Sequence, residues 1–139
     1  VLLRHEMEAA RNSETNDGVA EALGELASMG LKTAILTRNC RESVDIVMGK
    51  HGLYFDAVVT REDSLPKPDP DGVIIAAWRM GVHAEGCVMV GDYEFDIRAG
   101  RAAGALTVLY SPDGRGFQAE PDFAIRSMRE LPAVVRRSE

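Results

Sequence analysis

Two carboxylates stand close together in the second half of the chain, where a strand is expected to end. Asp92 and Asp96 lie four residues apart, directly after the apolar run 87–90 and Gly91. In open α/β sheets, ligands bind at the carboxyl ends of the strands. Carboxylates gathered there repel each other unless water or a metal ion separates them. The spacing therefore predicts part of a Mg²⁺-dependent phosphate site, which needs further residues to complete it.

Two further polar side chains follow other expected strands. Thr37 directly follows the run 33–36, and its hydroxyl and the neighbouring backbone N–H groups could bind an anion. Lys67 is held between two prolines in the loop after the run 57–60. Because parallel strands end at one edge of a sheet, we expect the hydroxyl, the ammonium and the carboxylates to face one ligand. Phosphoryl transfer depends on this kind of charge stabilisation and positioning.

Strand-like and helix-like segments alternate four times, which favours an α/β fold: a Rossmann-like parallel sheet with helices on both faces. The expected strands cover residues 33–36, 57–60, 87–90 and 105–110. The expected helices cover residues 18–29, 42–50, 70–80 and 96–103, with Asp69 as the N-cap of the third and a short helix opening at the capping-box pattern 127–130. Residues 1–12 have the composition of the end of a helix.

Composition excludes several classes of protein. The 139 residues are 45% hydrophobic and carry a formal net charge of −6, which argues against a nucleic-acid partner because such binding relies on clustered lysine and arginine. No apolar run approaches the roughly 18 residues of a membrane span. Cys40 and Cys87 fall at an expected helix start and in an expected buried strand, so we expect no disulfide and a cytoplasmic location.

Three of these motifs, in this order, resemble the haloacid dehalogenase superfamily of phosphohydrolases, in its phosphoglycolate-phosphatase-like branch. The strand 34–37 resembles the family's second motif, and Lys67 followed by Pro-Asp-Pro resembles the third. Gly-Asp-x-x-x-Asp at 91–96, before a helix rich in alanine and glycine, resembles the fourth. The resemblance covers residues 18–131. It implies a Mg²⁺-dependent phosphomonoesterase that acts on a small phosphorylated metabolite through an aspartyl-phosphate intermediate.

The resemblance also implies roles for the matching residues. Thr37 would hydrogen-bond the transferring phosphoryl group, and Lys67 would neutralise the charge of the nucleophile and the phosphate. Asp92 would bind Mg²⁺ directly or through water. Asp96 would support the metal shell and orient Lys67 or a water. We therefore expect Thr37, Lys67 and Asp96 to be catalytic.

Some neighbouring residues allow two interpretations. Arg38 and Asn39 could bind substrate phosphate, or they could be exposed turn residues. Cys40 could be a reactive thiol near a helix N-terminus, or a small half-buried residue. The sequence does not indicate an oligomeric state or name the substrate.

One family motif is missing. The family's first motif, Asp-x-Asp-x-Thr, follows the central strand and supplies the nucleophile, and it does not occur in these 139 residues. We therefore expect this chain to belong to a longer protein, with the first strand and most of a helical cap absent from it. Residues 1–16 would be a remnant of the cap or a linker, and residues 17–139 an incomplete core domain. The sheet would lack its middle strand, and the chain alone would be inactive.

Three alternatives remain. The chain could be a non-catalytic domain of the same fold that binds phosphate and metal. It could be a dehalogenating relative, but a Mg²⁺ carboxylate at Asp92 is a phosphatase feature of the family pattern. It could be a receiver-type signalling domain, which also combines an aspartate, Mg²⁺ and a lysine. In that class the lysine comes after the acidic pair, whereas here Lys67 precedes it.

Overall fold

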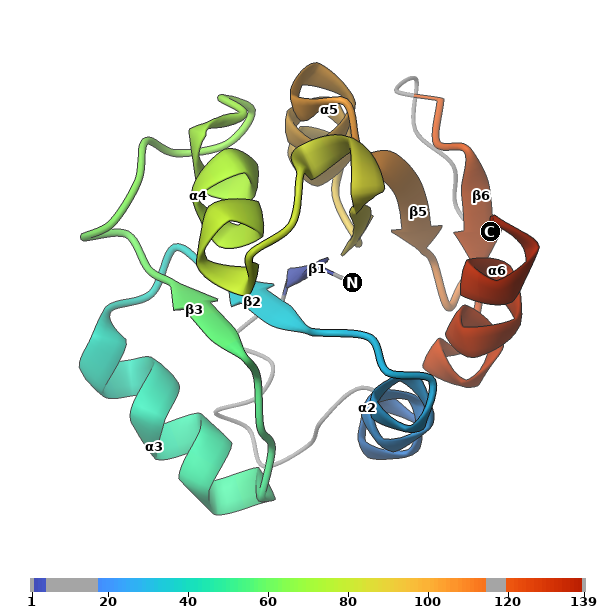
Figure 1. Ribbon diagram of the computed structural model, residues 1–139, viewed down its shortest axis with the longest axis horizontal. Helices are drawn as coiled ribbons and strands as arrows, with labels where there is room; N and C mark the ends of the chain where they lie inside the picture. Colours follow the sequence, from blue (N-terminus) through green and yellow to red (C-terminus); the bar gives the residue numbers. More distant parts are fainter. Residues whose placement is uncertain (1, 5–17, 115–119, 139) are drawn as a thin grey trace.

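The computed structural model describes residues 2–4, 18–114 and 120–138. In this part of the chain, six strands form one sheet in the order β3-β2-β1-β4-β5-β6, and every neighbouring pair is parallel (Figure 1). The strands are β1 Leu2–Arg4, β2 Ala34–Leu36, β3 Ala57–Val59, β4 Val88–Gly91, β5 Leu106–Tyr110 and β6 Phe123–Ile125. The expected parallel α/β architecture is therefore confirmed.

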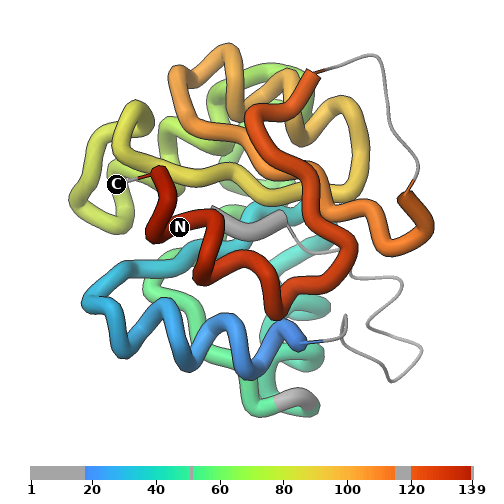
Figure 2. Tube along the Cα trace, turned by 90° about the vertical axis from the view of Figure 1, so that its right-hand side faces the viewer, coloured from blue at the N-terminus to red at the C-terminus, as the bar shows by residue number. Residues whose placement is uncertain are grey.

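Helices cover both faces of the sheet, as expected. They are α2 Val19–Ser28, α3 Arg41–His51, α4 Asp71–Met80, α5 Glu94–Ala103 and α6 Leu131–Arg137. Helices α4 and α5 pack on one face, and α2, α3 and α6 pack on the other, with α2 and α6 side by side (Figures 1 and 2). In β2, Ile35 packs in the core on the side of α2, α3 and α6. Its neighbours Ala34 and Leu36 pack in the core on the side of α4 and α5, as the alternation of side chains along a strand requires.

The middle of the sheet is filled, which corrects the expectation of a helix over residues 1–12. Residues 2–4 form β1, which lies between β2 and β4, with Leu3 opposite both Ile35 and Val90. The physical reason is that β2 and β4 each present a row of backbone N–H and C=O groups that need partners, and a short apolar segment can satisfy both rows. The remainder of the expected cap remnant, residues 5–17, lies outside the described residues.

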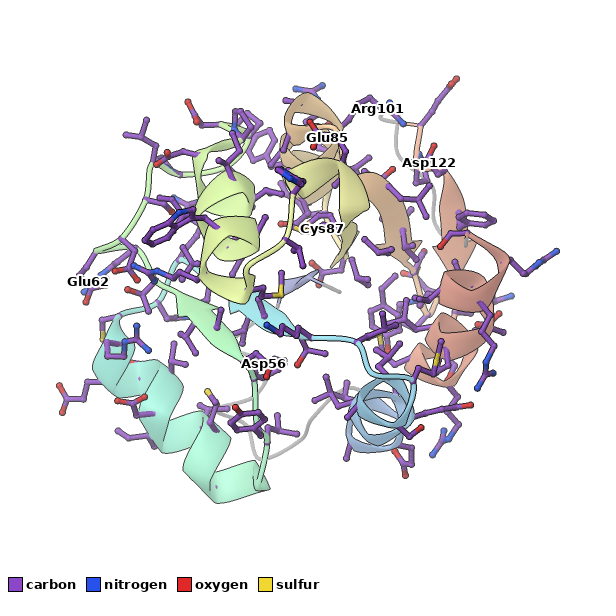
Figure 3. All side chains as sticks on the ribbon, viewed as in Figure 1. Asp56, Glu62, Glu85, Cys87, Arg101 and Asp122 are labelled. Atoms are coloured by element: carbon purple, nitrogen blue, oxygen red, sulfur yellow. The ribbon has the colours of Figure 1, made fainter. Side chains whose placement is uncertain are left out.

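Strand β6 was not expected from the sequence. Hydrogen bonds made by side chains at the amino ends of the strands help to join short strands such as β6 to their neighbours. Asp122 Oδ2, just before β6, accepts hydrogen bonds from Thr107 N at 2.8 Å and Thr107 Oγ1 at 3.0 Å. Asp56 Oδ2, just before β3, accepts one from Thr33 N at 2.8 Å. Both aspartates are labelled in Figure 3. Each carboxylate joins the start of one strand to the start of the next, so side chains supplement the few backbone bonds of a three-residue strand.

Two helix starts differ slightly from expectation. Helix α4 begins at Asp71 rather than Pro70, and Asp69 Oδ1 accepts the N–H of Asp71 at 2.9 Å. Helix α5 begins at Glu94 rather than Asp96, so Asp96 lies inside the first turn. None of the helices in the described ranges has the length and apolar character needed to cross a membrane.

Candidate functional site

A buried ion pair lies at the carboxyl edge of the sheet. Lys67 Nζ, in the loop between β3 and α4, is 3.0 Å from Asp96 Oδ1 in the first turn of α5. The side chains are 6% and 1% exposed. Both residues were predicted to belong to the site, and the structure brings them into direct contact.

The position of Asp96 depends on its own helix and on a glycine. Asp96 Oδ2 accepts a hydrogen bond from Tyr93 N at 3.1 Å, so one carboxylate oxygen caps α5 and the other binds Lys67. A negative charge in the first turn is also favoured by the helix dipole. A Cβ at Gly91 would lie 2.6 Å from Asp96 Cγ, which is too close for any side chain. The glycine of the Gly-Asp pattern therefore makes room for the second carboxylate.

The loop that carries Lys67 is fixed at both ends. At its start, Asp63 Oδ2 accepts Thr60 N at 2.7 Å and Thr60 Oγ1 at 2.9 Å, and Asp63 Oδ1 accepts Arg79 Nη2 at 3.3 Å. The backbone hydrogen bond from Thr60, followed by the bond from Arg79, lowers the pKa of Asp63 to about 2. Near its end, Leu65 N donates to Asp71 Oδ2 at 2.9 Å.

Thr37 is buried at the end of β2, and its hydroxyl is held by a neighbour. Its backbone N donates to Val59 O at 3.0 Å. Its Oγ1 accepts hydrogen bonds from Asn39 N at 3.1 Å and Asn39 Nδ2 at 3.3 Å. A hydroxyl that accepts from one side can donate its proton to an anion on the other. Asn39, expected to bind substrate phosphate or to be an exposed turn residue, donates its side-chain amide to Thr37 and is not among the residues that line the adjacent pocket.

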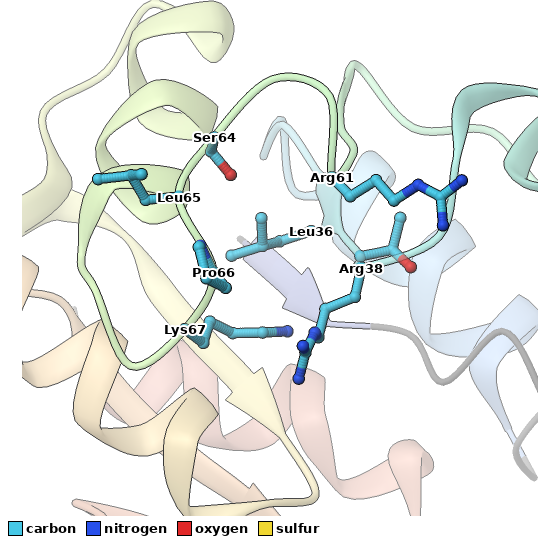
Figure 4. Close-up of a pocket in the computed structure, with 8 residues that line it drawn as sticks. Leu36, Arg38, Arg61, Ser64, Leu65, Pro66 and Lys67 are labelled. Atoms are coloured by element: carbon cyan, nitrogen blue, oxygen red, sulfur yellow. The ribbon is translucent and has the colours of Figure 1, made fainter.

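The pocket beside this edge has a volume of about 320 Å³ (Figure 4). Its lining includes the predicted residues Thr37, Arg38 and Lys67. The other lining residues were not singled out from the sequence: Leu36, Arg61, Ser64, Leu65 and Pro66. In Figure 4 the charged ends of Arg38 and Lys67 point toward each other. The signal that could have found Arg61 is its place directly after β3, at the same sheet edge as Thr37.

Asp92 lies on the β4 side of the pocket, between β4 and α5, and is half-buried. In the described part of the chain, no group of three or more His, Cys, Asp or Glu side chains gathers to hold a metal ion. Mg²⁺ commonly uses one or two carboxylates and takes its other ligands from water and substrate oxygens. Asp92 fits such a role. Asp96 fits the role of partner to Lys67, because both of its oxygens are already engaged.

The two cysteines are free thiols. Cys40 is half-buried at the N-cap position of α3, and a hydrogen bond with Ser43 lowers its pKa. Cys87 is buried, and burial raises its pKa. No disulfide joins the two sulfur atoms.

Comparisons with known proteins place these features in a family. The chain is 36% identical over 120 residues to the pyrophosphatase PpaX of Bacillus velezensis, a match that covers 81% of this chain and 56% of that protein. The structure of a HAD phosphatase from Thermococcus onnurineus is similar with a TM-score of 0.77 and 29% identity, covering 83% of this chain and 55% of that one. A 2-haloacid dehalogenase from Pseudomonas syringae is similar with a TM-score of 0.76 and 30% identity, covering 87% and 53%.

This chain thus spans between half and two thirds of the length of these relatives. Their names include both a phosphatase and a dehalogenase, so the likeness alone does not choose between the two chemistries. The family model for haloacid dehalogenase-like hydrolases matches residues 2–110, which is most of the chain. On this match, together with the three motifs at one sheet edge, the chain belongs to the haloacid dehalogenase-like hydrolase family.

Proposed function

We propose that the protein is a Mg²⁺-dependent hydrolase of small phosphorylated metabolites. The observation that carries this proposal is the buried Lys67–Asp96 pair at 3.0 Å, whose lysine lines a pocket together with Thr37 and Arg38. An ammonium fixed in this way stabilises charge on a transferring phosphoryl group without having to reorganise. A pocket lined by three cationic side chains and no carboxylate suits a phosphate.

Each residue at the edge has a distinct part in the proposal. The hydroxyl of Thr37 donates a hydrogen bond to a phosphoryl oxygen, and Lys67 neutralises the negative charge that develops on the phosphoryl group. Asp96 is a positioning residue that holds Lys67 through its Oδ1. Asp92 would hold Mg²⁺, which when bound supplies further charge stabilisation at the phosphoryl oxygens.

The attacking group lies outside this set. The family resemblance assigns it to the Asp-x-Asp-x-Thr motif, which does not occur in these 139 residues. The proposal therefore gives this chain phosphate binding and charge stabilisation, and it leaves unassigned the carboxylate on which an aspartyl-phosphate intermediate would form. The substrates to test first are an aryl phosphate and inorganic pyrophosphate, since the relative from Bacillus velezensis is named a pyrophosphatase. The free thiols support a cytoplasmic location.

The missing motif also favours a second candidate function, a non-catalytic domain that binds phosphate and metal. One experiment separates the two. The protein, expressed from its complete coding sequence, is assayed with p-nitrophenyl phosphate and pyrophosphate with and without Mg²⁺. We expect Mg²⁺-dependent hydrolysis, and a loss in kcat of about 100-fold or more for Lys67→Ala, the range found when one preorganised donor is removed. Lys50→Ala, on the exposed side of α3, is the matched control.

The outcomes are distinct. Hydrolysis that survives Lys67→Ala would refute the proposed role of the pocket. Absence of hydrolysis together with orthophosphate binding in calorimetry would favour the binding domain. Absence of both would refute the two candidates together.

A further inference from the structure

The pocket contains more positive charge than one phosphoryl group needs. Lys67 is compensated by Asp96, but the pocket is also lined by Arg38 and Arg61. Neither arginine forms an ion pair with a carboxylate of the described residues. Other arginines there do form such pairs, namely Arg41, Arg79, Arg98, Arg129 and Arg136. No carboxylate lines the pocket, although Glu62 interacts electrostatically with Arg61 from outside it, so the two guanidinium groups are suited to an anionic ligand.

The order of the strands places these charges in sequence along the sheet edge. Arg61 follows β3, Arg38 follows β2, and Asp92 follows β4, with β1 between β2 and β4. The acidic end of the edge is therefore on the β4 side and the cationic end on the β3 side. A phosphoryl group bound by Thr37 and Lys67 would have the metal carboxylate on one side and the two arginines on the other.

Resting on the proposed function, we propose that Arg38 and Arg61 form a second anionic subsite, which binds a negatively charged group on the non-transferred part of the substrate. This group is a carboxylate or a second phosphate, since a guanidinium pairs with both through parallel hydrogen bonds. Leu36, Leu65 and Pro66 supply an apolar wall to the same pocket.

The pocket has room for a small ligand. Its volume of about 320 Å³ is near the lower end of the roughly 300–1,000 Å³ usual for small-molecule sites. A short molecule with two anionic ends fits this space. Arg38 and Arg61 come from different loops, so binding to both depends on the distance between the two anionic groups of the substrate as well as on their charge.

The test compares three substrates that differ in the group next to the transferred phosphate: pyrophosphate, 2-phosphoglycolate and p-nitrophenyl phosphate. The variants are Arg38→Gln, Arg61→Gln and the double variant, made in the protein expressed from its complete coding sequence. Arg101→Gln is the matched control, because Arg101 is an exposed arginine on α5 outside the pocket (Figure 3). We expect each pocket variant to lower kcat/KM for one of the two substrates with a second anionic group, pyrophosphate or 2-phosphoglycolate, about 10-fold to 100-fold more than for the aryl phosphate, mainly through KM.

The substrate with the larger selective loss identifies the second group as phosphate or carboxylate. Equal losses on all three substrates, or none on any, would overturn the subsite. If the wild type hydrolyses no phosphate compound, the proposed function fails, and the subsite is then judged by calorimetry with pyrophosphate and 2-phosphoglycolate. At least 10-fold weaker binding of one of them by Arg61→Gln than by Arg101→Gln would support the subsite, and equal binding of both ligands by the two variants would refute it.

Discussion

Neutralising Asp96 is expected to lower the free energy of unfolding, because it removes the partner of the buried Lys67 ammonium. Asp96→Asn leaves the Lys67 ammonium buried beside an amide, with the lysine side chain 6% exposed. Removing one partner of a buried ion pair typically costs about 3–5 kcal/mol, because the remaining charge stays away from water. Asparagine can still accept the hydrogen bond from Tyr93 N, so the loss reports the ion pair and not the cap of α5.

The double variant Lys67→Met/Asp96→Asn separates this cost from general damage to packing. With both charges gone no buried ion remains, so we expect the free energy of unfolding to return to within about 2 kcal/mol of the wild type. Glu94→Gln is the matched control. It removes a partner from the partly exposed Arg98–Glu94 pair of the same helix, which should cost at most about 0.5 kcal/mol.

Urea unfolding followed by far-ultraviolet circular dichroism measures all four proteins, with the free energy extrapolated to zero urea. If Asp96→Asn does not fold, the double variant should still fold, and its free energy of unfolding is then compared with that of the wild type. A loss below about 1 kcal/mol for Asp96→Asn, or a double variant no more stable than Asp96→Asn, would refute a tightly coupled buried pair.

Three shorter predictions concern residues that shape the edge or the fold. Gly91→Ala should cost about 1–3 kcal/mol in unfolding free energy because its Cβ would collide with Asp96, whereas Gly86→Ala, with open space around it, should not. The Asp63 carboxylate, whose folded pKa of about 2 lies below its ordinary 3.8, stabilises the fold fully above the ordinary value. This stabilisation, about 1 kcal/mol after allowing for solvent screening of a partly exposed group, is lost as the pH falls from 3.8 toward 2. The difference in urea midpoint between wild type and Asp63→Asn should therefore shrink across that range. Ser127→Ala should cost about 1 kcal/mol in thermal unfolding, because Ser127 Oγ caps the N–H of Arg129.

Most of the fold could be predicted from local patterns, and the misses have a physical cause. The helices α2 to α5 combine one apolar face with a C-terminal glycine or a turn, signals that lie within the segment itself. Strands β1 and β6 were missed, although β2 and β3, which also have three residues each, were predicted, so length alone does not separate the two cases. The conformation of β1 and β6 comes from pairing with β2, β4 and β5, which are distant in the sequence. Such pairing is a property of the sheet and leaves little trace in local composition.

The candidate site divides in the same way. Thr37, Lys67, Asp92 and Asp96 could be placed at one edge, because the carboxyl ends of parallel strands converge there. Arg61 also follows a strand at this edge, but its role was missed because one arginine in a polar turn resembles any other until the turn is known to face a pocket.

The structure also distinguishes residues that stabilise the carboxyl edge of the sheet from residues that recognise a ligand. Asp96 binds the lysine loop with one oxygen and its own helix with the other, so a change there alters stability and activity together. Arg38 and Arg61 are exposed and form no ion pair with the described carboxylates, so neutralising them should change unfolding free energy by no more than about 0.5 kcal/mol. An effect of these arginines on substrate preference with unchanged stability would therefore report recognition directly. An equal effect at Asp96 could not be interpreted without the unfolding data.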